Sequence, residues 1–152
     1  MPVKKRIQFV TEIEAPPSEV YDLIVGPESY KRWTSAFLEG SYFEGSWGQG
    51  EKIRFLSPSG DGMIAEIAEN RRGEFISIRH LGVINKGVED TESEDVRAWT
   101  PAFENYTLEP VDAGTRLVVD QDVTDDFESY MQEAWPKALA KLKELAEDEH
   151  GA

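Results

Sequence analysis

The segment from about Asp125 to Glu147 constrains the fold more than any other feature of this sequence. Its apolar residues recur at spacings of three and four, the period that places side chains on one face of an α-helix. The stripe consists of Phe127, Met131, Ala134, Ala138, Leu142 and Leu145, and it is widened by Trp135, Leu139 and Ala146. Pro136 removes one hydrogen bond inside this helix and costs about 3 kcal/mol. Because burial of each large apolar side chain contributes ~1.5–3 kcal/mol, we expect a long helix held by packing against another layer.

The chain before this helix indicates a sheet. Residues 7–15 alternate between apolar and polar side chains, which predicts a half-buried strand, and two short helices are predicted over 18–25 and 27–33. Further strand candidates cover residues 37–44, 51–56, 63–69, 74–81, 102–110 and 115–123. Short turns between successive strands favour an antiparallel meander. We therefore predict an α+β helix-grip fold, in which a curved antiparallel sheet of about six or seven strands carries two short helices and the long C-terminal helix.

One connection is unusually long. Residues 85–100 hold five acidic side chains between Glu89 and Asp95 and end near Trp99. Loops of this length in a compact domain are commonly functional or mobile, and the sequence leaves both roles open.

Composition narrows the class of protein. At 152 residues the chain fits one domain, spanning residues 1–152. The balance of 16 basic against 30 acidic residues gives a net charge of −14, which argues against binding nucleic acid or an anionic membrane surface. No apolar run reaches the ~18 residues of a membrane span, and no apolar region follows the basic residues near the N-terminus. We predict a cytoplasmic protein without membrane insertion.

Motifs for metals and cofactors are weak. There is no cysteine, and the histidines are His80 and His150, so we predict no metal site. The glycine-rich residues 45–52 approach a phosphate-binding loop, but Glu51 stands where a lysine is needed. No nucleophile elbow with a G-x-S-x-G pattern is present, and we predict no cofactor.

His80 is the one candidate for acid–base chemistry. It has the same strand parity as Ile76 and Ile78, so we expect it to face the same apolar interior. There it could shuttle a proton or polarise a carbonyl, although a core histidine satisfied by a neighbouring hydroxyl or carbonyl is the commoner case. Glu66 and Arg79 are expected on the opposite, outer face.

Aromatic residues are numerous, with four tryptophans, five tyrosines and seven phenylalanines. Trp99 and Trp135 lie near the ends or breaks of elements, where they could line a cavity or fill the core. Trp33 is expected in the core, whereas Tyr106 and Leu108 should both face inward. The predicted ligand-binding residues are Ile78, His80, Trp99, Tyr106, Leu108, Met131 and Trp135.

Residues 14–33, 75–82 and 103–120, together with the closing helix that carries Trp135, resemble the SRPBCC (START/Bet v-like) superfamily. Within it, the chain is most similar to homologues of the activator of the ninety-kilodalton heat-shock chaperone's ATPase. The resemblance implies a deep apolar cavity between the sheet and the long helix, which different members use for lipids, hormones, polyketides or hydrophobic metabolites. It also implies a chaperone as a possible partner.

Three functional hypotheses follow. The first is a binding module for a hydrophobic or amphipathic small molecule beneath the C-terminal helix. The second is an enzyme of cyclase or hydratase type, with His80 as acid or base and Tyr106 orienting the substrate. The third is stimulation of a chaperone ATPase through the acidic surface.

Overall fold

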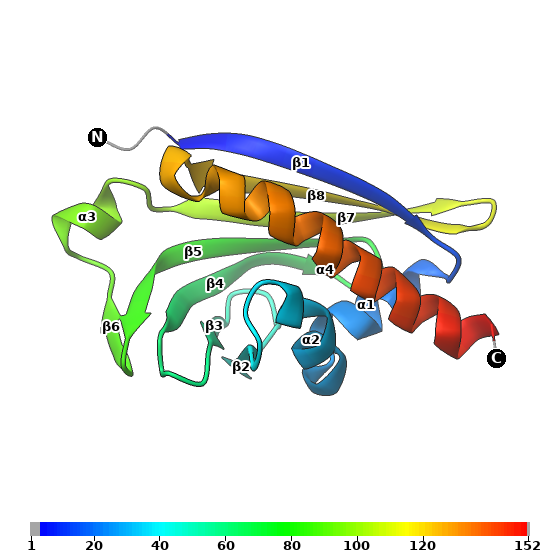
Figure 1. The fold of residues 1–152 in the computed structure, drawn as a ribbon, viewed down its shortest axis with the longest axis horizontal. Coiled ribbons are helices and arrows are strands. Elements are labelled where there is room, and N and C mark those ends of the chain that lie inside the picture. Colours follow the sequence, from blue (N-terminus) through cyan, green and yellow to red (C-terminus); the bar gives the residue numbers. More distant parts are fainter. Residues whose placement is uncertain (1–3, 152) are drawn as a thin grey trace.

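A curved sheet and one long helix laid across it dominate the computed structural model, which describes residues 4–151 (Figure 1). For residues 149–151 it describes the backbone alone, so the side chain of His150 lies outside the described residues.

The strands are β1 (Lys4–Ile13), β2 (Tyr42–Gly45), β3 (Lys52–Leu56), β4 (Gly62–Arg71), β5 (Phe75–Asn85), β6 (Val88–Asp90), β7 (Ala102–Val111) and β8 (Gly114–Thr124). They form one antiparallel sheet in the order β1-β8-β7-β5-β4-β3-β2, and β6 pairs with β5 beside this path. Register shifts interrupt the pairing of β4 with β5 after Ile64 and after Ile67, and such bulges increase local bending. The predicted α+β helix-grip fold is confirmed.

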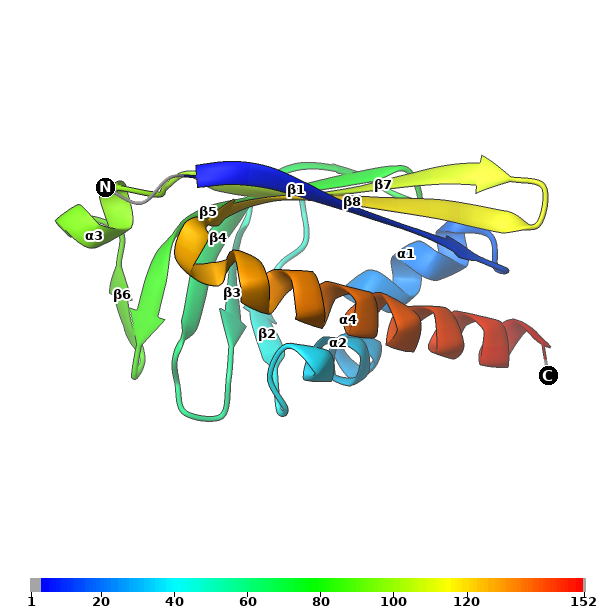
Figure 2. The ribbon, with the colours of Figure 1, turned by 45° about the horizontal axis from the view of Figure 1, so that its top comes forward.

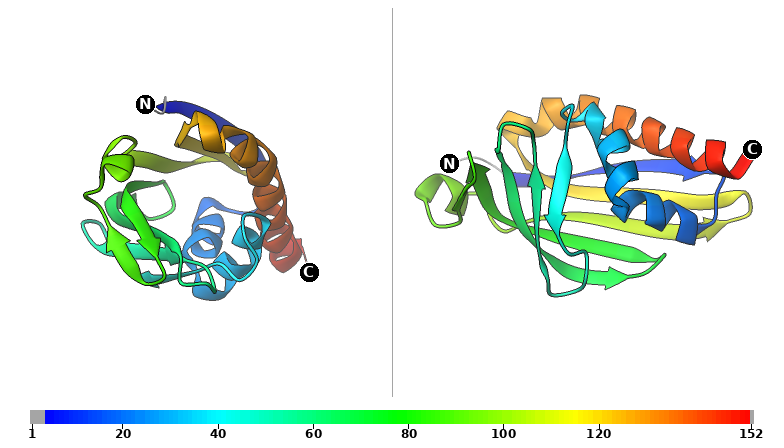
Figure 3. Two further views of the ribbon diagram at one scale, coloured as in Figure 1. Left: turned by 60° about the vertical axis from the view of Figure 1, so that its left-hand side comes forward. Right: turned by 90° about the horizontal axis from the view of Figure 1, so that it is seen from below.

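The helices are α1 (Pro17–Val25), α2 (Pro27–Trp33), the 3-10 turn η1 (Thr34–Ala36), α3 (Glu94–Arg97) and α4 (Asp125–Gly151). Figure 2 shows α4, α1 and α2 on the same side of the sheet, and the end-on view of Figure 3 shows the strands curling around them. In the part of the chain that the structure describes, no helix is both long and apolar enough to cross a membrane.

Local sequence explains how the short helices begin. Pro17 and Pro27 occupy the first turns of α1 and α2, where a missing N–H costs no helical hydrogen bond. Val20 and Ile24 from α1 are fully buried in the main core, together with Ile13 of β1. The core therefore lies between the sheet and the helices, as the alternation in the first strand predicts.

The two halves of α4 differ in their packing. Ala138, Leu142 and Ala146 in the second half are buried in the core. Pro136 lies inside α4, which is one continuous helix (Figure 1). Phe127 in the first turn is 60% exposed, so its predicted place in the buried stripe is wrong. Periodicity assigns a residue to a helix face, but it does not show where along the helix the core ends.

The long connection contains regular structure that the sequence analysis missed. Lys86 and Gly87 both have positive φ, 47° and 84°, in the two-residue turn between β5 and β6. The short helix α3 follows, and the hydroxyl of Ser93 accepts a hydrogen bond from Val96 N at 3.3 Å as its cap. The segment predicted as one long loop over residues 85–100 therefore contains a strand and a short helix.

The first strand candidate of the meander is shorter than predicted. Phe37 and Leu38 continue from η1 as a turn, because both of their backbone N–H groups donate to the carbonyl of Thr34. Pairing with β3 begins only at Tyr42. The alternation over residues 37–44 spans a turn and a strand.

Candidate functional site

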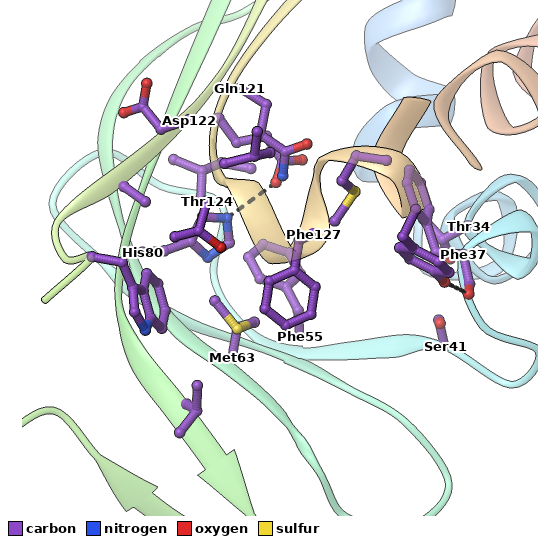
Figure 4. A pocket seen from close by; sticks show the side chains of 18 of the residues that line it. Thr34, Phe37, Ser41, Phe55, Met63, His80, Gln121, Asp122, Thr124 and Phe127 are labelled. Atoms are coloured by element: carbon purple, nitrogen blue, oxygen red, sulfur yellow. Dashed lines mark hydrogen bonds and ion pairs between the residues drawn. The ribbon is translucent and has the colours of Figure 1, made fainter. Parts of the chain in front are cut away.

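A cavity of about 580 Å³ lies between the curved sheet and the first half of α4. Side chains from β3, β4, β5, β7 and β8 line it on one side, and side chains from α2, α4 and the segment around α3 close the other. Figure 4 shows Phe55, Met63, His80 and Phe127 converging on this space from four elements. The volume falls within the ~300–1,000 Å³ range of small-molecule sites. The cavity expected from the sequence is present.

His80 lies in this cavity, on β5, and is 8% exposed. Its Nε2 is 3.0 Å from a carboxylate oxygen of Glu104 on the neighbouring strand β7. Because an ionised carboxylate only accepts hydrogen bonds, the geometry assigns the hydrogen to Nε2. The other ring nitrogen, Nδ1, is buried and has no hydrogen-bond partner. His80 is thus tethered at one nitrogen and unsatisfied at the other.

Glu104 lines the cavity as well, and the sequence analysis did not identify it. Its second carboxylate oxygen accepts a hydrogen bond from the hydroxyl of Tyr106, so Glu104 joins His80 and Tyr106 into one network. Burial, followed by the charge of Glu104, raises the pKa of Tyr106 well above its ordinary value, and the hydroxyl stays protonated. Alternate residues of a strand point to the same face, so the inward position predicted for Tyr106 also implies an inward position for Glu104.

Aromatic side chains form the wall next to this network. The ring of Trp33 lies 6.4 Å from Tyr106, and the ring of Trp47 lies 5.7 Å from Phe55. Tyr30 contacts both tryptophans, and burial raises its pKa. The indole Nε1 atoms of Trp33 and Trp47 are buried without a hydrogen-bond partner. Trp33 belongs to the hydrophobic core, as predicted, and its side chain also lines the cavity.

Trp135 closes the cavity from α4. Its Nε1 donates a hydrogen bond of 2.6 Å to the side-chain oxygen of Gln121 on β8. The ring packs edge-on against Phe37, with centroids 4.8 Å apart, and Met131 lies one turn earlier on the same helix. Trp135 marks the boundary along α4 between the part that lines the cavity and the part that packs in the core.

The first turns of α4 form the mouth of the cavity. Phe127 lines the cavity although it is largely exposed, so this end reaches solvent. The Tyr130 hydroxyl donates a hydrogen bond to the carbonyl oxygen of Phe37, which fixes α4 to the turn after α2. Leu38, in the same turn, is 54% exposed. Trp99 faces the cavity from the segment after α3.

Charged groups in the lining are mainly acidic. Besides Glu104 they comprise Asp90, Asp95 and Asp122, whereas the basic members are Lys4 and His80. Burial raises the pKa of Asp122, but the hydrogen bonds from Arg6 and from Phe103 N, with the nearby positive charges, outweigh it and hold that pKa below its usual range. Asp122 therefore remains a carboxylate paired with Arg6 at 2.9 Å.

The structure brings together all but one of the predicted site residues. The cavity is lined by Ile78, His80, Trp99, Tyr106, Met131 and Trp135. Leu108 points to the same side of the sheet but does not reach the cavity, because it packs in the hydrophobic core. Glu66 and Arg79 do not line the cavity and form an ion pair with each other, as their predicted place on the outer face allows. Within residues 4–148, no group of three or more His, Asp or Glu side chains is arranged to hold a metal ion.

The sequence matches the family of activator of Hsp90 ATPase homologue 1-like proteins over residues 14–147. A search of curated proteins gave no match.

Solved structures of similar fold are distant in sequence. Protein MLL2253 from Mesorhizobium loti has a TM-score of 0.70 and 17% identity, covering 93% of this chain and 96% of that one. The Aha1 dimer from Colwellia psychrerythraea has a TM-score of 0.70 and 19% identity, covering 94% and 96%. DynU16, from the dynemicin biosynthetic locus, has a TM-score of 0.66 and 15% identity, with 91% of this chain covering 46% of that one. These likenesses show the shared fold.

Proposed function

The chain belongs to the family of activator of Hsp90 ATPase homologue 1-like proteins, and we propose that it binds a hydrophobic or amphipathic small molecule beneath α4. The size of the cavity and its aromatic walls support this proposal.

One observation carries the proposal. Three nitrogen atoms of the cavity walls are buried and have no hydrogen-bond partner: Nε1 of Trp33, Nε1 of Trp47 and Nδ1 of His80. A buried polar group without a partner costs ~1–3 kcal/mol, and proteins satisfy nearly all such groups. Three of them around one cavity fit a ligand with an apolar body and a few polar atoms. The proposed contact residues are Ile78, His80, Trp99, Tyr106, Met131 and Trp135.

A ligand screen by nuclear magnetic resonance tests the proposal. We expect compounds from a lipid and polyketide library to shift the amide signals of His80, Trp99, Tyr106 and Trp135. The signals of Val20 and Ile24, which lie in the closed core under α1, should stay in place.

A pair of variants links binding to the cavity. Met131→Trp places a larger side chain at the half-buried, cavity-lining position on α4 and should abolish binding. Val10→Trp, at a 53% exposed position on β1, is the matched control and should bind as the wild type does. A screen in which no compound shifts the cavity signals would contradict ligand binding.

The contact between His80 and Glu104 favours a second candidate function, a cyclase or hydratase. A carboxylate that holds one imidazole nitrogen fixes the orientation of the ring for proton transfer, and here the other nitrogen, Nδ1, is buried without a partner. His80→Ala should then abolish turnover of a ligand found in the screen and leave the fold intact. Glu66→Gln, which removes a carboxylate outside the cavity, should keep full activity. Unchanged turnover in His80→Ala would exclude this role.

A chaperone partner and a cytoplasmic location remain proposals from the family and the composition. The net charge of −14 would favour a basic partner surface, and binding should then weaken as salt rises. If the amount of chaperone captured in a pull-down does not change with salt concentration, an electrostatic interface is contradicted.

A further inference from the structure

The charges of the cavity lining are unbalanced. The lining residues include four acids, Asp90, Asp95, Glu104 and Asp122, against Lys4 and His80, with Asp95 exposed and Asp122 paired with Arg6. Even a protonated His80 leaves the lining with an excess of negative charge. An anionic ligand would enter against this potential, and the net charge of the whole chain has the same sign.

One of the two enclosed carboxylates, that of Glu104, has no fixed cation beside it. Glu104 has 16% of its side chain exposed, and its hydrogen-bond partners in the structure are the Tyr106 hydroxyl and His80 Nε2. Asp122, in contrast, is paired with Arg6. A carboxylate in partly apolar surroundings gains much more from a nearby positive charge than one in water, because the effective dielectric constant is lower. A cationic group on a ligand would supply that charge.

His80 sets a second requirement. With its Nε2 hydrogen directed to Glu104, the Nδ1 of the neutral ring is a lone-pair acceptor, and it is buried without a partner. A hydrogen-bond donor on the ligand would satisfy it, whereas a carboxylate or carbonyl oxygen would not. The two ring nitrogens point away from each other, so one ammonium group meets the need of Glu104, and a separate donor on the ligand would meet that of Nδ1.

The surrounding rings favour the same group. Tyr30, Trp33, Trp47 and Phe55 form a continuous set of aromatic contacts, and Phe55 lies 5.9 Å from the His80 ring. Aromatic faces attract cations, and Trp does so most strongly. The remaining walls are apolar and accept a hydrophobic body.

We propose that the cavity selects a cationic amphiphile, an aromatic or aliphatic molecule carrying a protonated amine, over neutral and anionic molecules of the same shape. This inference rests on the proposed function, since it concerns the same cavity. The amine lies against Glu104, and the hydrophobic body lies between the sheet and α4.

Calorimetric titration with three matched probes tests the selectivity. The probes are 2-(2-naphthyl)ethylamine, 2-(2-naphthyl)ethanol and the carboxylate of 2-naphthylacetic acid. They share one ring system and are cationic, neutral and anionic. We expect the amine to bind at least tenfold more tightly than the alcohol, which corresponds to ~1.4 kcal/mol. The acetate should bind most weakly. The order should persist at about 0.5 M NaCl, where attraction by distant surface charges is screened.

Variants assign the preference to one carboxylate. Glu104→Gln should reduce the advantage of the amine over the alcohol to less than about threefold, because the charge is lost and the shape is kept. Glu66→Gln changes the net charge by the same amount outside the cavity and should leave the advantage unchanged. Circular dichroism of each variant establishes that it is folded.

The outcomes separate the two proposals. If all three probes bind equally, or the acetate binds best, the charge selectivity is overturned and ligand binding stands. If no probe binds and the library screen is also negative, both proposals fail. An amine preference that survives in Glu104→Gln would overturn the assignment to this site.

Discussion

At the scale of single residues, the polar atoms of the cavity wall differ in whether they have a hydrogen-bond partner. Tyr106 and Trp135 lie in the cavity wall with their polar atoms bonded, to Glu104 and to Gln121. Trp33 and His80 are also buried, but each keeps one nitrogen unpaired. Under the proposed function, a ligand would gain hydrogen bonds at the unpaired atoms, and the paired atoms hold the wall in place.

The buried tyrosines give a prediction in alkaline solution. Burial raises the pKa of both Tyr30 and Tyr106 above the ordinary value of about 10. Between that value and the folded pKa, the unfolded chain has lost a proton that the folded chain keeps, so stability falls as pH rises. We expect the urea midpoint to drop steadily above about pH 10 and to drop less steeply in Tyr106→Phe. A urea midpoint that stays constant up to about pH 11, roughly one pH unit above the ordinary tyrosine pKa, would contradict ionisation-linked unfolding.

Trp135 gives a prediction about stability. Trp135→Phe leaves a smaller ring and an unpaired, buried oxygen on Gln121, and should lower the free energy of unfolding by ~2–4 kcal/mol. The double variant Trp135→Phe with Gln121→Met should cost less than the sum of the two single variants, because the two residues share one hydrogen bond. Strict additivity in urea denaturation would show that this bond contributes nothing.

At the scale of elements, α4 serves two purposes along its length. Its second half buries small and apolar side chains against the core, and its first half presents Phe127, Met131 and Trp135 to the cavity. The turn after α2 meets this first half through the bond from Tyr130 to the Phe37 carbonyl. Packing at one end thus holds the helix while the other end leaves space beneath it.

Pro136 gives the prediction for this element. It is exposed on α4, where its missing N–H leaves the carbonyl of Gln132 without its helical donor. Pro136→Ala restores that donor and should raise the free energy of unfolding by ~1–3 kcal/mol, somewhat reduced by the greater freedom of the unfolded chain. Lys137→Ala, at the exposed neighbouring position, is the control and should change stability by less than ~0.5 kcal/mol. An equal effect of both changes in thermal denaturation would show that the proline carries no penalty here.

At the scale of the whole molecule, curvature of the sheet creates the cavity. The bulges between β4 and β5 lie in strands of this curved sheet, and the left view of Figure 3 shows the sheet curling, with α4 along its open side. The strand order then brings β5, β7 and β8 side by side, so that His80, Glu104 and Gln121 reach one space from three strands.

The net charge of −14 gives a prediction for the whole molecule. Repulsion among like charges destabilises the folded state, and added salt screens it. We expect the thermal midpoint to rise by about 2–6 °C between roughly 10 mM and 300 mM NaCl. A lower midpoint in salt would show that the surface ion pairs, such as Lys5 with Glu128, outweigh the repulsion.

The sequence alone was enough to predict most of the elements and six of the residues that line the cavity. Alternation in β5 placed His80 inward, and the stripe of α4 identified Met131 and Trp135, because side-chain direction within one element follows from its periodicity. The same parity in β7 pointed to Glu104, which was overlooked because an acidic residue among apolar ones suggests the outer face. The hairpin and helix within residues 85–100 were missed because their turn and cap signals lie among acidic residues that suggest a loop.

What periodicity cannot supply is position along an element and pairing between elements. It could not show that Leu108 packs in the core while Tyr106 reaches the cavity, or that Phe127 lies at the mouth. Nor could it place His80 at 3.0 Å from Glu104, because that distance depends on the register of β5 against β7 and on the bend of the sheet. Local pattern thus determined which face each residue occupies, and tertiary packing decided which of those residues share a cavity.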